Sequence, residues 1–135
     1  MPSETVLVVD DNVFVLNTIS AGLRHAGFTV LTARAPEEAI EIGLRHTGPI
    51  HLILLDVLLP RMDGPELASQ FLRLHPESRS LFMTGLPNTP RVADQILSRG
   101  LAFLPKPFLP QVLAQKVREV LAAPSVRRMG ASYPP

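Results

Sequence analysis

The sequence predicts an α/β fold, in which a five-stranded parallel sheet is covered by helices on both faces. Short apolar segments alternate along the 135 residues with amphipathic segments of helical spacing. Apolar runs of this length are typical of strands buried on both faces. Their alternation with helices favours a parallel sheet with right-handed crossovers. We expect one domain over residues 1–123 and a disordered tail, rich in Pro and Ser, over residues 124–135.

Four of the five predicted strands end next to a polar residue. The first is a β-branched run that stops at Asp10 and Asp11, and the third stops at Asp56. The fourth ends at Thr84, and Lys106 follows the fifth. The predicted strands cover residues 5–9, 28–32, 51–55, 80–83 and 101–104.

Proline and glycine mark the ends of the predicted helices. Gly27 lies just beyond the first helix, Pro36 opens the second, and Gly100 closes the fourth. Proline in the first turn and glycine after the last turn are typical helix boundaries. The predicted helices cover residues 13–25, 36–46, 66–74, 90–100 and 109–122.

Composition excludes several classes of function. The chain has no cysteine, so disulfides, cysteine metal sites and thiol catalysis are absent. The net charge is +1 and the basic residues are scattered, which gives no reason to expect direct binding to nucleic acid. No signal peptide is visible, and no apolar run approaches the roughly 20 residues of a membrane span. We therefore expect a cytoplasmic protein without a membrane partner.

Three carboxylates follow strands that end at the same edge of such a sheet. If the first and third strands are neighbours, Asp10, Asp11 and Asp56 converge in one crevice. Clustered carboxylates repel one another and need a cation. Oxygen ligands indicate Mg²⁺ or Ca²⁺, and the acids are too few for a calcium cage made by the protein alone. We expect Mg²⁺, with water and phosphate completing its coordination.

The polar residues at this edge suit phosphoryl transfer. Asp56 would attack phosphorus as a nucleophile. The other groups of the site would then neutralise the negative charge on the phosphoryl oxygens. The metal, Lys106 and Thr84 could each cover one of them.

Four motifs in this order resemble the receiver domain of two-component response regulators. They are Val9–Asn12, Leu54–Gly64, Met83–Gly85 and Phe103–Phe108. The resemblance covers about residues 5–122. It implies a flavodoxin-like doubly wound sheet with strand order 2-1-3-4-5.

The resemblance also implies a role for each matching residue. Asp56 would be the phospho-acceptor, with Thr84 and Lys106 contacting the phosphoryl group. The implied Mg²⁺ ligands are Asp10, Asp11, Asp56 and the backbone carbonyl of Leu58. Thr84 and Phe103 would form the conformational switch, with Phe103 in place of the more common tyrosine. The bond between Lys106 and Pro107 would be cis, a form that is accessible at low energy only before proline.

Simpler interpretations exist for the same residues. Asp10 and Asp11 could cap the first helix. Lys106 could lie along the surface, and Thr84 could be an ordinary hydroxyl at a strand end. Asp63 is interpreted as a turn residue because it precedes Gly64. The histidines at positions 25, 46, 51 and 75 share no ligand spacing, so we interpret them as structural.

The leading functional interpretation is a signalling switch rather than an enzyme. A histidine kinase or phosphotransfer protein would phosphorylate Asp56, and the domain would support its own phosphorylation and dephosphorylation. The last two helices and strand five would then change their affinity for a downstream protein or a fused output domain. The chain would be a monomer or a phosphorylation-dependent dimer. The alternatives are a Mg²⁺-dependent phosphohydrolase with an aspartyl-phosphate intermediate and a pseudo-receiver that takes no phosphate.

Overall fold

Five parallel strands form the central sheet in the order β2-β1-β3-β6-β7, which confirms the predicted topology. The computed structural model describes residues 4–59, 61–84, 102–106 and 108–123, and of Leu58 and Thr84 it describes the backbone alone. The strands are β1 (Thr5–Val9), β2 (Thr29–Ala33), β3 (Leu52–Asp56), β6 (Arg79–Thr84) and β7 (Ala102–Pro105). Predicted and observed ends differ by a residue or two, as is usual for strand boundaries.

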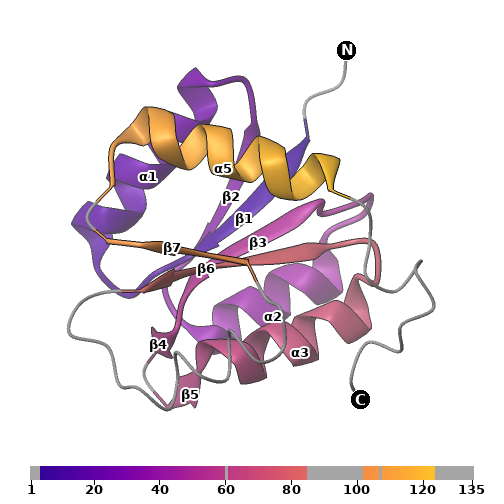
Figure 1. The fold of residues 1–135 in the computed structure, drawn as a ribbon. Helices are drawn as coiled ribbons and strands as arrows, with labels where there is room; N and C mark the ends of the chain where they lie inside the picture. The colour runs from indigo at the N-terminus through magenta and orange to yellow at the C-terminus, as the bar shows by residue number, and fades with distance from the viewer. Residues whose placement is uncertain (1–3, 60, 85–101, 107, 124–135) are drawn as a thin grey trace.

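Helices of the described part of the chain cover both faces of the sheet (Figure 1). α1 and α5 lie on one face, and α2 and α3 lie on the other. Their bounds are Val13–His25 for α1, Pro36–Arg45 for α2, Gly64–Leu74 for α3 and Pro110–Ala122 for α5. The helix predicted over residues 90–100 and the tail over 124–135 lie outside the described residues.

The core is divided by the sheet into two layers. Alternate residues of a strand point to opposite faces, so Val6 and Val8 pack toward α1 and α5 while Leu7 and Val9 pack toward α2 and α3. All four side chains are completely buried. β1 is therefore a strand covered on both faces, and Asp10 directly follows it.

A small antiparallel ribbon interrupts the connection between β3 and α3. It consists of β4 (Leu58–Leu59) and β5 (Met62–Asp63). Arg61, in the turn between them, has a left-handed φ of 66°. Strands of two residues are too short to show a period, so the sequence predicted only a loop here.

None of the helices in the described part of the chain is long and apolar enough to cross a lipid bilayer.

Candidate functional site

Two carboxylates and an ammonium group meet at the carboxyl edge of the sheet. Asp10 directly follows β1, Asp56 is the last residue of β3, and Lys106 directly follows β7. A backbone hydrogen bond of 3.1 Å from the N–H of Val57 to the carbonyl of Met83 continues the pairing of β3 with β6 past Asp56. The topology therefore brings together residues that lie far apart in the chain, as the strand order predicted.

Lys106 forms the closest contact of the site. Its Nζ atom lies 2.7 Å from Oδ2 of Asp56 and 3.8 Å from Oδ2 of Asp10. The lysine side chain is 26% exposed and that of Asp56 is 18% exposed, so the pair is largely shielded from water. The interpretation of Lys106 as a surface lysine is therefore wrong.

Asp10 is the buried acid of the site. Its Oδ1 accepts a 2.9 Å hydrogen bond from the N–H of Asn12. Its Oδ2 has no hydrogen-bond partner among the residues that the structure describes. Burial raises the pKa of the Asp10 carboxyl, and the charges of Asp56 and Asp11 add to the rise. The Asn12 N–H and the Lys106 ammonium oppose the rise without cancelling it.

Asn12, rather than Asp10 or Asp11, caps α1. Its side-chain oxygen accepts a 3.2 Å hydrogen bond from the N–H of Val15. The interpretation of the two acids as helix caps is therefore wrong. The signal for Asn12 was present in the sequence, because asparagine three residues before a helical N–H is a preferred cap. Asp11 is exposed at the rim of the site.

The residues present fit a metal ion that takes much of its coordination from water. Among the described residues, no three His, Cys, Asp or Glu side chains lie close enough to hold a metal by themselves. The side chain of Asp56 instead contacts Lys106. The buried Oδ2 of Asp10 is nonetheless a carboxylate oxygen without a hydrogen bond from any residue that the structure describes, and Mg²⁺ needs only one or two carboxylates beside water and phosphate.

Several predicted features of the site lie outside the described residues. These are the hydroxyl of Thr84 and the Lys106–Pro107 peptide bond. The backbone of Thr84 is described and pairs with Pro105 of β7. Phe103 is partly buried and packs against the core layer under α2 and α3.

The start of α3 lies directly against the end of β3. Oδ1 of Asp63 accepts a 2.8 Å hydrogen bond from the N–H of Glu66 and caps the helix. Asp63 was predicted to lie in a turn, but it is the last residue of β5. The N–H of Gly64 donates to the carbonyl of Val57 at 2.8 Å. In the sequence, Gly64 is recognisable only as a turn glycine after Asp63, because a contact between the backbones of two elements leaves no local sequence pattern.

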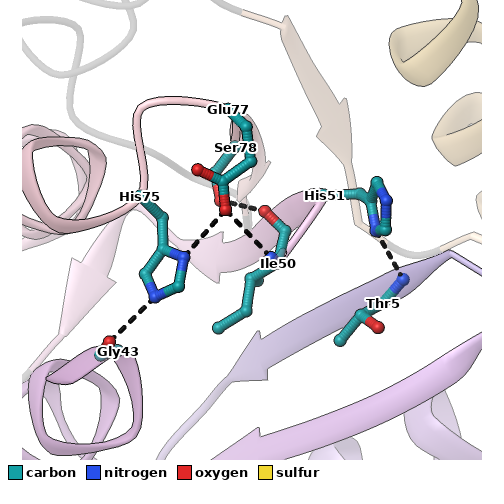
Figure 2. A network of polar contacts seen from close by, with 7 residues as sticks. All are labelled: Thr5, Gly43, Ile50, His51, His75, Glu77 and Ser78. Atoms are coloured by element: carbon teal, nitrogen blue, oxygen red, sulfur yellow. Dashed lines mark hydrogen bonds and ion pairs between the residues drawn. The ribbon is translucent and has the colours of Figure 1, made fainter. Parts of the chain in front are cut away.

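The opposite, amino edge of the sheet holds two of the histidines in a separate polar network (Figure 2). Nδ1 of His51 accepts a 2.9 Å hydrogen bond from the N–H of Thr5. His75 is buried, and its Nε2 donates to the carbonyl of Gly43 while its Nδ1 pairs with Oε2 of Glu77, each at 2.8 Å. These contacts support the structural role that was predicted for His51 and His75.

Comparison with known proteins agrees with this arrangement. The chain matches the response regulator receiver domain family over residues 6–118. It is 34% identical over 119 residues to the sensor kinase CckA of Brucella abortus (strain 2308), covering 88% of this chain and 13% of the kinase. It is 30% identical over 131 residues to the alkaline phosphatase synthesis transcriptional regulatory protein PhoP of Bacillus subtilis (strain 168), covering 91% of this chain and 52% of that protein.

Comparison with solved structures also indicates a receiver domain. The crystal structure of a CheY-like response regulator receiver domain protein from Methanospirillum hungatei JF-1 superposes with a TM-score of 0.78 and 27% identity. The superposition covers 89% of this chain and 94% of that one. The chain belongs to the response regulator receiver domain family. It is a phospho-accepting signalling domain of the two-component type, and it spans about half or less of the two curated relatives described above.

Proposed function

We propose that Asp56 is the phospho-acceptor of this receiver domain and that the reaction depends on Mg²⁺. The contact of 2.7 Å between Lys106 Nζ and Asp56 Oδ2 carries the proposal. It fixes an ammonium group where the oxygens of a phosphoryl group on Asp56 would lie. The neighbouring Asp10 supplies a buried carboxylate oxygen that accepts no hydrogen bond from the described residues and that could bind a metal ion.

The chemistry follows from these charges. A carboxylate oxygen of Asp56 attacks the phosphorus of a phosphohistidine, an O–P bond forms, and the N–P bond to the imidazole breaks. The ammonium of Lys106 then moves its interaction from the carboxylate to a phosphoryl oxygen. A Mg²⁺ ion held by Asp10, Asp11, Asp56 and the backbone carbonyl of Leu58 would neutralise part of the phosphoryl charge.

The downstream part of the proposal concerns the two residues of the predicted switch. The hydroxyl of Thr84 would contact the new phosphoryl group, and Phe103 would change its packing on β7. The face formed by β7 and the last two helices would then bind a downstream protein, a fused output domain or a second copy. The donor would be a cytoplasmic histidine kinase or phosphotransfer protein, and the same site would assist hydrolysis of its own phosphoryl group.

The test is phosphorylation by acetyl phosphate, followed by the mass of the intact protein. We expect the wild-type chain to gain one phosphoryl group in the presence of Mg²⁺ and none after chelation. Asp56→Asn should gain none under either condition. Glu119→Gln, which changes an exposed carboxylate on α5, is the matched control and should behave as wild type.

Two results would contradict the proposal. A wild-type chain that gains no mass would be a pseudo-receiver. Repeated turnover of a small phosphoester, in place of one stoichiometric transfer, would indicate a phosphohydrolase.

A further inference from the structure

Gly64 lies against the backbone of the residue that we propose to be phosphorylated. A Cβ atom placed on Gly64 would lie 2.9 Å from the Cα of Val57 and still closer to the carbonyl oxygen of Asp56. Real Cβ atoms do not approach other atoms so closely. Because both neighbours are backbone atoms, neither can rotate away as a flexible side chain would.

Glycine is needed at this position for space and not for backbone conformation. Among the described residues, the glycines with a left-handed φ are Gly27 and Gly48, so Gly64 has a backbone angle that other residues can adopt. Its N–H donates to the carbonyl of Val57 at 2.8 Å. The absence of a side chain and this hydrogen bond together hold α3 against the end of β3.

The first turn of α3 is itself held in place, so it limits how far the backbone at the end of β3 can move toward it. Asp63 caps the helix through the N–H of Glu66, and Gly64 and Pro65 are buried. Asp63 also pairs with Leu58 in the ribbon of β4 and β5. Any added atom at position 64 must therefore displace the Asp56–Val57 backbone, which joins the proposed acceptor at the end of β3 to Leu58 at the start of β4.

We propose that Gly64 is a positioning residue for phosphoryl transfer. It sets how closely α3 approaches the Asp56–Val57 peptide. It thereby sets the position of the Asp56 carboxylate against Lys106 and the position of the Leu58 carbonyl that would bind Mg²⁺. This inference rests on the proposed function, which makes Asp56 the acceptor.

Gly64→Ala tests the inference, with Gly43→Ala as the matched control. A Cβ on Gly43 would also meet an atom at 2.9 Å, but that atom belongs to the ring of Phe71 in the core between α2 and α3. Gly43 lies at the amino edge, where its carbonyl accepts from His75. Both variants therefore add one methyl group at a crowded site, and only one of the two sites adjoins Asp56.

The first readout is the rise in melting temperature that Mg²⁺ causes, which does not require phosphorylation. The second is the Mg²⁺ concentration that gives half the maximal rate of phosphorylation by acetyl phosphate. In Gly64→Ala we expect the Mg²⁺-induced rise to shrink and the second value to increase about tenfold or more, as displaced supporting contacts commonly cause. In Gly43→Ala the melting temperature without metal should fall while both Mg²⁺ responses stay at the wild-type level.

Wild-type Mg²⁺ responses in Gly64→Ala would overturn the inference, and so would equal losses in the two variants. If Gly64→Ala is unfolded in buffer, both readouts are repeated in trimethylamine N-oxide, which favours the folded state. If Gly64→Ala stays unfolded in trimethylamine N-oxide, Gly64 is needed for overall stability, and this result would also overturn the inference. If the wild-type chain takes no phosphoryl group, the proposed function fails, while the Mg²⁺ shifts of the two variants still test the role of Gly64.

Discussion

At the scale of single residues, Asp10 is buried, yet only one of its two carboxylate oxygens accepts a hydrogen bond from the described residues. One of its oxygens accepts from the Asn12 N–H, and the other has no hydrogen bond within the described part of the chain. Lys106 lies nearer to Asp56 than to Asp10 and cannot satisfy both acids at hydrogen-bond distance. Ionisation of Asp10 therefore lowers the stability of the metal-free domain.

Asp10→Asn should make the metal-free protein more stable. Asparagine can still accept from the Asn12 N–H, while the buried charge and its repulsion with Asp56 disappear. Because the pKa of Asp10 is raised in the folded state, ionisation at neutral pH costs stability there, and removing the charge recovers it. We expect a rise in melting temperature of a few degrees, on the order of 1 kcal/mol, and a loss of the further rise that Mg²⁺ causes in wild type.

Asp11→Asn is the control for that measurement. Asp11 is exposed, so its neutralisation should leave the melting temperature without metal nearly unchanged. A fall in the melting temperature of metal-free Asp10→Asn would mean that the attraction to Lys106 outweighs the cost of burial.

At the scale of elements, the amino edge of the sheet is held by a polar network that does not reach the site. Oε2 of Glu77 accepts from the buried N–H of Ile50 at 3.1 Å and pairs with His75 (Figure 2). The ring of His75 also stacks on Phe71. The hydroxyl of Ser78 donates to the carbonyl of Ile50. The segments that enter β3 and β6 are thus joined to each other and to the end of α2.

Glu77→Ala should lower the free energy of unfolding by about 1–3 kcal/mol, because the N–H of Ile50 loses its acceptor and the ring of His75 loses its partner. Burial acts to raise the pKa of Glu77, but the hydrogen bonds of His75 and of backbone N–H groups outweigh it and leave that pKa lowered. The stabilisation is therefore present above the unfolded value of 4.5 and is lost as the pH falls through the lower folded pKa. Urea unfolding of both proteins at several pH values measures it, and the two curves should converge in acid.

Glu41→Ala removes a carboxylate from an exposed i,i+4 pair on α2 and should change the stability by less than about 0.5 kcal/mol. Phosphorylation by acetyl phosphate should be unchanged in Glu77→Ala. A slower reaction would show that the two edges of the sheet are coupled.

The elements differ in how far the sequence could predict them. Long segments with a clear period, such as α1 and β1, were predicted within a residue or two of their ends. The ribbon of β4 and β5 was missed because two residues show no alternation. The acids and Lys106 were predicted from their places after strands, whereas the contact of Gly64 with Asp56 depends on how α3 approaches β3. Such distances between elements are set by tertiary packing, which no local pattern records.

At the scale of the whole molecule, the acids of the site and the lysine beside them lie far apart along the chain. β2, β1 and β3, which are neighbours in the sheet, all lie within the first 56 residues. Asp10 and Asp11 directly follow β1, and Asp56 ends β3. Lys106 follows Asp56 by 50 residues. During synthesis, Asp10, Asp11 and Asp56 therefore leave the ribosome well before Lys106, whose ammonium group balances part of their negative charge.

A growing chain that has reached β3 has only ions from solution to balance those charges. We expect Mg²⁺ to accelerate refolding several-fold as well as to slow unfolding, if the three acids approach one another before β7 joins the sheet. Refolding and unfolding rates measured across denaturant concentrations, with and without Mg²⁺, separate the two effects. An effect on unfolding alone would mean that the acids meet only after Lys106 has arrived. In that case the ammonium group of Lys106, rather than Mg²⁺, balances the charge of the acids during folding.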